Sequence, residues 1–139
     1  MGWALRRFSL TKAVPLTISR GTTASVVRLE LTLQHNGLVG RGETGGFETG
    51  HRAFVLEAVE QELLALLPQL EALDPECRQR FEPLLAPLSP PARCAVDLAL
   101  WDWHGQRLGH PLWRLWGLDG GAGVAPSVTL GRGAVRQAL

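Results

Sequence analysis

The segment GRGETG, residues 40–45, has the G-x-G-x-x-G spacing with which some proteins bind a dinucleotide. Dinucleotide binding needs a strand that leads through this turn directly into a helix, inside a parallel βαβ unit. Here the preceding residues form one arm of an expected antiparallel hairpin, and Glu43 would place a negative charge beside the pyrophosphate. We therefore interpret the segment as a strand end whose glycines permit close backbone contacts.

The residues that could bind a metal ion are unfavourably spaced for it. His104 and His110 are six positions apart and Asp97 and Asp102 are five apart, so neither pair has the i, i+4 spacing of one helix face. We expect Asp97 to pair with Arg93, one helical turn earlier. We expect Asp102 to bond a neighbouring loop. The spacing predicts no metal site built within this chain.

Arg20 is the strongest candidate for binding an anionic group. It lies between Ser19 and Gly21 in a segment rich in hydroxyl side chains, and an arginine on such a small-residue loop can hold a carboxylate through two parallel hydrogen bonds. From the chemistry of the residues alone, a solvated loop arginine is the commoner outcome, and both interpretations stay open. Lys12 is the only lysine and tyrosine is absent, so chemistry that needs a tunable amine or phenol has almost no side chain to use here.

The N-terminal part of the sequence predicts an antiparallel meander of three strands. Residues 3–10 and 38–43 are expected to form the outer strands, and residues 25–34 alternate apolar and polar side chains as a half-buried central strand. Asn36 and Gly37 favour the positive φ angles of a tight hairpin turn between the last two strands. Residues 15–23 are expected to form a loop.

The rest of the chain is predicted to be helical. Helices are expected over residues 51–67, ended by Pro68, over residues 74–85, from Ser89 to about Gly109, and over residues 111–116. The longest of these is apolar around most of its circumference and, with the next helix, carries four of the five tryptophans. Such a helix must be covered on several sides, which predicts a larger body than 139 residues provide.

Composition and domain organisation exclude several classes of function. The net charge of +1 argues against nucleic acid as a partner, and no apolar run is long enough to span a membrane. The two cysteines are far apart and are expected to be reduced thiols of a cytoplasmic protein.

We expect a domain over residues 1–118, a Gly-rich linker over residues 119–126, and the start of a truncated second domain, opening with a strand, over residues 127–139.

The order of elements and several motifs resemble the N-terminal capping domain of the enolase superfamily, in its mandelate racemase and muconate lactonizing branch. The motifs are AVDLALWD (residues 95–102), LGHPLWRLWG (residues 108–117), VGRGE (residues 39–43) and SVTLG (residues 127–131). The segment ISRG, residues 18–21, narrows the resemblance toward dipeptide epimerases of the L-Ala-D/L-Glu type. The implied fold is α+β: a three-stranded antiparallel meander and a helical bundle, followed by the first strand of a missing (β/α) barrel.

The resemblance also implies a mechanism. Family members remove the proton α to a carboxylate, epimerases do so with two lysines, and Mg²⁺ stabilises the enolate formed. The lysines and the acidic residues that bind Mg²⁺ belong to the barrel, so this chain is expected to hold no catalytic or metal-binding residue. Alone, it is expected to be inactive and to depend on its own C-terminal barrel.

What the capping domain contributes, by this resemblance, is substrate specificity. Two mobile loops, over residues 17–23 and 44–51, are expected to close over the barrel mouth. We predict contacts with a small substrate, an acidic dipeptide or related carboxylate, from Ile18, Arg20, Thr22 and Phe47. The second of these loops departs from the family pattern because it lacks the common Pro- and Tyr-containing segment. The resemblance therefore does not identify which substrate is bound.

Other functions are compatible with the same sequence. The same kind of domain occurs in o-succinylbenzoate synthases and N-acylamino-acid racemases, although ISRG argues against the synthase. A non-enzymatic, stand-alone interaction module would use the Trp-rich helix as a partner surface. A homo-oligomer is compatible with all of these.

Overall fold

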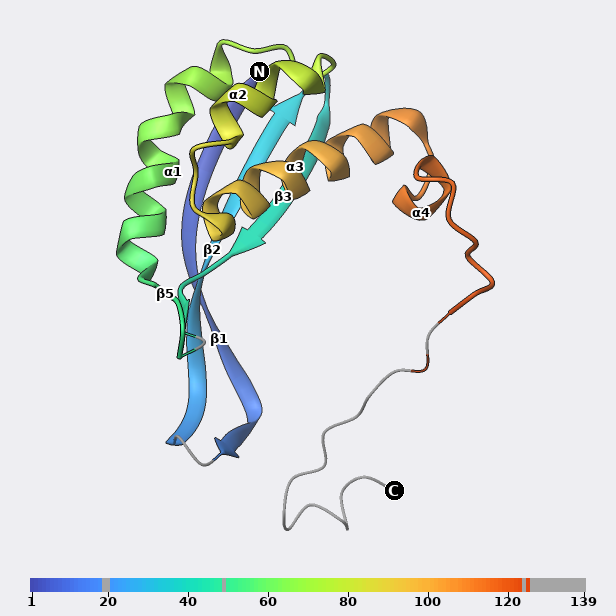
Figure 1. Cartoon of the computed structure of the whole chain (residues 1–139). Helices are drawn as coiled ribbons and strands as arrows, with labels where there is room; N and C mark the ends of the chain where they lie inside the picture. The colour runs from blue at the N-terminus through green and yellow to red at the C-terminus, as the bar shows by residue number, and fades with distance from the viewer. Residues whose placement is uncertain (19–20, 49, 124, 126–139) are drawn as a thin grey trace.

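An antiparallel sheet followed by helices makes up the computed structural model, which describes residues 1–18, 21–48, 50–123 and 125 (Figure 1). The main sheet has the order β1–β2–β3, and β4 and β5 form a separate two-stranded pair. The strands are β1 (Gly2–Ile18), β2 (Gly21–His35), β3 (Leu38–Thr44), β4 (Phe47–Glu48) and β5 (Ala53–Phe54). The helices are α1 (Leu56–Glu71), the short 3-10 helix η1 (Arg78–Phe81), α2 (Glu82–Leu85), α3 (Pro90–Leu108) and α4 (Leu112–Leu115). The predicted α+β meander with following helices is confirmed.

The core lies between one face of the sheet and the helices. Leu29, Leu31 and Leu33 of β2 are completely buried, because alternate residues of a strand share one face. The opposing residues come from α1, η1 and α3; they include Leu63, Leu70, Phe81, Val96, Leu100 and Trp103. Arg7 of β1 also donates hydrogen bonds of 2.7 and 2.5 Å to Glu60 of α1. This contact holds the pKa of Glu60 below its ordinary value.

Local signals fix the turn and both ends of the long helix as predicted. Asn36 and Gly37 adopt φ angles of 50° and 75° in the hairpin between β2 and β3. Ser89 precedes α3, which has proline in its first turn, and Gly109 ends it in the left-handed conformation. These features depend on single residues and their neighbours, which is why the sequence predicts them.

The predicted loop over residues 15–23 is wrong where the structure describes it, because its two sides are strands. β1 continues to Ile18 and β2 begins at Gly21, so the two strands extend beyond β3 as a paired ribbon (Figure 1). Thr, Val and Ile side chains favour extended backbone. Pro15 causes no lost ladder bond, because it falls where the register shifts between Thr11 and Leu16.

Three helix boundaries also differ from the prediction. α1 begins at Leu56 rather than residue 51, since Ala53 and Phe54 pair with β4, and it continues through Pro68 to bury Leu70. Proline removes one backbone donor, but burial of an apolar side chain outweighs that loss in the last turn. After Asp74, whose carboxylate accepts the Glu76 N–H at 3.0 Å, helical structure begins only at η1.

The two cysteines lie on the surface of the described part of the chain. Cys77 and Cys94 are free and exposed. Within the described part of the chain, no helix is long and apolar enough to cross a membrane. The strand predicted over residues 127–130 lies outside the described residues, as does the rest of the expected second domain.

Candidate functional site

The tip of the β1–β2 ribbon carries the first group of predicted substrate contacts. The hydroxyl groups of Thr17 and Thr22 are 2.9 Å apart across the two strands, and both side chains are exposed. The backbone of Ile18 pairs with Gly21, whose φ of 135° is one that glycine tolerates. Arg20 and the side chain of Ile18 lie outside the described residues. The described tip therefore presents hydroxyl groups.

The GRGETG segment lies in strand β3, except for Gly45, and packs against helix α3. A Cβ atom on Gly40 would lie 2.2 Å from the carbonyl oxygen of Ala99, and one on Gly42 would lie 1.9 Å from that of Ala95. Any side chain at either position would collide with helix backbone. The interpretation of these glycines as a site of close backbone contact is confirmed.

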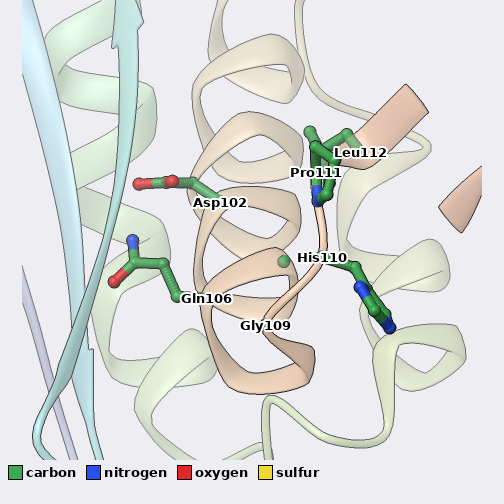
Figure 2. A pocket seen from close by; sticks show the side chains of 7 residues that line it. Asp102, Gln106, Gly109, His110, Pro111 and Leu112 are labelled. Carbon is green, nitrogen blue, oxygen red and sulfur yellow. The ribbon is translucent and has the colours of Figure 1, made fainter. Parts of the chain in front are cut away.

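Polar side chains of α3 bind the outer edge of β3 (Figure 2). Asp102 Oδ2 accepts the Arg41 N–H at 2.8 Å, and Gln106 Nε2 donates to the carbonyl oxygen of Val39 at 2.8 Å. Asp102 therefore bonds a strand, not the loop that we predicted. Because β3 is the edge strand, these bonds satisfy backbone groups that face away from β2. His110, in the same pocket of about 380 Å³, points away from the sheet (Figure 2).

The predicted pair of Asp97 with Arg93 is replaced by a tertiary contact. Asp97 Oδ1 lies 2.5 Å from Arg78 Nη2, and Arg93 lies 3.6 Å from Glu82 instead. The guanidinium of Arg78 is also 4.6 Å from the ring centre of Trp101. A guanidinium that stacks on an aromatic ring while it binds a carboxylate competes well against an exposed pair on the same helix.

The β4–β5 hairpin carries the second predicted contact, Phe47, which remains 45% exposed. Its ring centre lies 4.9 Å from that of Phe54, and Phe54 packs against the core. Gly46 fits closely, since a Cβ there would lie 2.7 Å from the carbonyl oxygen of Phe54. Just before the hairpin, the buried Thr44 donates a hydrogen bond of 2.7 Å to the carbonyl oxygen of Pro91 in α3. The expected loop is therefore a hairpin attached to the body.

The two groups of predicted contacts lie on different elements. Thr17 and Thr22 contact each other at the ribbon tip, whereas Phe47 contacts Phe54 in the hairpin. Gly45, just before the hairpin, lies against Arg28 of β2, because an added Cβ would be 2.7 Å from its guanidinium.

Two residues of the hairpin region were missed by reasoning from sequence. Thr44 shares one face of β3 with Gly40 and Gly42, so the alternation of small residues contained a signal for it. Phe54 was missed because it falls where a helix was predicted. Its contact with Phe47 depends on the β4–β5 pairing.

The described residues do not fit a magnesium site. Within residues 1–18, 21–48, 50–123 and 125, no three His, Cys, Asp or Glu side chains gather closely enough to hold a metal ion. No step of a reaction is therefore assigned to these residues through a metal.

A Trp-rich face, defined by Leu98, Trp101, Trp113 and Trp116, lies on α3 and α4. The exposed fractions of Leu98, Trp113 and Trp116 are 42%, 42% and 50%. Trp116 stands edge-on to Trp101, with ring centres 5.3 Å apart. Grouped apolar side chains at this exposure are typical of an interaction surface.

Comparison with known proteins identifies the segment as a domain found in other proteins. The family model for the mandelate racemase / muconate lactonizing enzyme N-terminal domain matches residues 4–117. A hydrophobic dipeptide epimerase from Roseobacter litoralis is 36% identical over 124 residues, which are 88% of this chain and 35% of that protein. An L-Ala-D/L-amino acid epimerase from a Maribacter strain is 27% identical over 130 residues, or 92% and 38% of the two chains.

A solved structure has the same fold. The dipeptide epimerase from Methylococcus capsulatus, complexed with Mg and the dipeptide L-Arg-D-Lys, is 28% identical, with a TM-score of 0.70. The match covers 84% of this chain and 35% of that one. The present chain thus spans little more than a third of the length of each of these relatives.

Proposed function

Because the chain belongs to the mandelate racemase / muconate lactonizing enzyme family, of which it carries the N-terminal domain, we propose that the whole protein is a dipeptide epimerase. The observation that carries this proposal is that both curated relatives are named as epimerases. Neither of these two relatives is named as an o-succinylbenzoate synthase or an N-acylamino-acid racemase.

The role of this chain is that of a substrate-specificity cap over residues 1–118, joined through residues 119–126 to a barrel that begins near residue 127. The barrel supplies the groups that move the proton α to the carboxylate between the two faces of the substrate, and it binds Mg²⁺. The Methylococcus capsulatus relative was solved with Mg and a dipeptide, which supports Mg²⁺ as the metal of the whole protein. The cap itself supplies side chains that recognise the dipeptide.

The barrel is also the partner that covers the Trp-rich face. Leu98, Trp113 and Trp116 each keep 42–50% of their surface exposed, and covering that remaining surface stabilises by about 1 kcal/mol each. A position in the cytoplasm is supported by the free thiols of Cys77 and Cys94.

The substrate class follows from which element contacts the variable side chain of the dipeptide. Arg20 at the ribbon tip would bind the carboxylate of an acidic dipeptide such as L-Ala-L-Glu. A second candidate, an apolar dipeptide, is favoured by the exposed ring of Phe47, which can cover an apolar side chain. The name of the Roseobacter relative agrees with the second candidate.

The test is epimerisation by the whole protein, followed by proton NMR in D₂O with Mg²⁺ present. L-Ala-L-Glu and L-Ala-L-Leu are each incubated with the enzyme. We expect loss of the α-proton signal together with the appearance of the second diastereomer for at least one of them. The 139-residue chain alone serves as the control and is expected to give no turnover. If the whole protein exchanges the α-proton of neither dipeptide, the proposal is overturned.

A further inference from the structure

Three hydrogen bonds attach β3 to α3 along its length. Gln106 binds Val39 and Asp102 binds Arg41 near the start of the strand, and both bonds lie at the exposed edge. The third, from the hydroxyl of Thr44 to the carbonyl oxygen of Pro91, is 2.7 Å long and buried. Water cannot reach the buried site to replace the Thr44 hydroxyl, so removing that hydroxyl loses the tie between β3 and α3, whereas exposed edge groups can bind water instead.

The position of this third bond is distinctive because the hairpin begins immediately after it. Only Gly45 and Gly46 separate Thr44 from Phe47. Gly46 lies in direct backbone contact with Phe54 and Leu56, since an added Cβ would be 2.7 and 2.8 Å from their backbone atoms. The chain between the α3 contact and the Phe47 ring is thus short and closely packed.

We infer that Thr44 is a positioning residue, whose hydrogen bond to Pro91 fixes the β4–β5 hairpin and thereby the ring of Phe47 against substrate. Phe54 packs against the Phe47 ring, with ring centres 4.9 Å apart, and Thr44 fixes where the hairpin leaves the sheet. The inference rests on the proposed function in one respect, namely that Phe47 contacts the dipeptide. Thr44 is itself buried and is not expected to contact the dipeptide, so its role in substrate binding is indirect.

The expected consequence is a change in apparent affinity. If the hairpin is in place in a smaller fraction of molecules, the apparent affinity for substrate falls by that fraction. For Thr44→Val, which keeps the shape and removes the hydroxyl, we expect the KM for L-Ala-L-Leu to rise about threefold to tenfold, with kcat changed by less than about twofold. Thr44→Ser, which keeps the hydroxyl, is expected to restore KM to within about twofold of the parent value.

A control variant separates positioning from general destabilisation. Gln106→Leu removes the bond at the other end of β3, far from Phe47 in sequence, and is expected to leave KM within about twofold of the parent. The double variant Thr44→Val/Phe47→Ala tests whether Thr44 acts through Phe47. If it does, the KM of the double variant exceeds that of Phe47→Ala alone by less than about twofold.

A second measurement keeps the inference testable without turnover. Amide hydrogen exchange in β4 and β5 is expected to accelerate in Thr44→Val and in Gly46→Ala, which displaces the hairpin backbone directly, but not in Gln106→Leu. Unchanged exchange in Thr44→Val, or equal KM increases in Thr44→Val and Gln106→Leu, would overturn the positioning role. An inactive parent enzyme with accelerated exchange in Thr44→Val would contradict only the proposed function.

Discussion

The ribbon tip and the β4–β5 hairpin were both predicted to contact substrate, but the molecule holds them in opposite ways. The hydroxyl groups of Thr17 and Thr22 bond each other and are exposed on a ribbon that extends beyond β3. Phe47 lies on Phe54, which belongs to the edge of the core, and Thr44 ties the start of its hairpin to α3. One element is polar and locally held, whereas the other is apolar and held by the body.

This difference teaches how each element responds to changes elsewhere. A strand pair without a third strand or a helix against it has few contacts to transmit a distant change. A hairpin packed on buried side chains moves when the body moves. Substitutions at the contact of Thr44 with α3 should therefore alter the hairpin, and the ribbon tip should respond only to its own residues.

The largest expected effect contrasts glycines of the two regions. Gly42→Ala forces a Cβ atom to within 1.9 Å of the Ala95 carbonyl oxygen and should lower the free energy of unfolding by about 3 kcal/mol. Gly21→Ala meets no neighbouring atom within 4 Å but keeps a strained φ of 135°, and should cost about 1 kcal/mol. Thermal unfolding of the whole protein measures both. Equal losses would show that the α3–β3 contact can relax.

A reciprocal change in substrate selectivity is expected next. Arg20→Ala should raise the KM for L-Ala-L-Glu about tenfold and leave that for L-Ala-L-Leu nearly unchanged, because it removes a charged hydrogen bond. Phe47→Ala should do the reverse, also by about tenfold, because it removes an apolar contact. Steady-state kinetics on both dipeptides measures the two variants. If each variant affects both substrates equally, neither element selects the side chain.

The smallest effect comes from the same chemical change made in both regions. Thr44→Val should lower the free energy of unfolding by about 1 kcal/mol, because its hydroxyl bonds a buried carbonyl. Thr17→Val should change it by less than about 0.5 kcal/mol, because water can replace its exposed partner. Urea denaturation of the two variants measures the difference. A larger loss for Thr17→Val would mean that the ribbon contributes to the stability of the body.

Features that depend on neighbouring residues could be predicted from the sequence. Alternation along β2 gave its buried face, Asn36 and Gly37 gave the turn, and Ser89 and Gly109 gave the limits of α3. Features that depend on competition between distant residues could not. Helix α1 continues through Pro68 because other elements bury Leu70. Asp97 pairs with Arg78 rather than with Arg93, because the fold brings Arg78 beside it.

The same distinction applies to the candidate site. By itself, the sequence determined the α+β meander with its helices and the close backbone approach at Gly40 and Gly42. Residue types and local spacing suffice for these. Only the tertiary structure decided that residues on both sides of the predicted first loop form a paired ribbon and that Thr44 and Phe54 hold the β4–β5 hairpin. Those contacts form when elements distant in the chain pack together, and no local pattern encodes the packing partner.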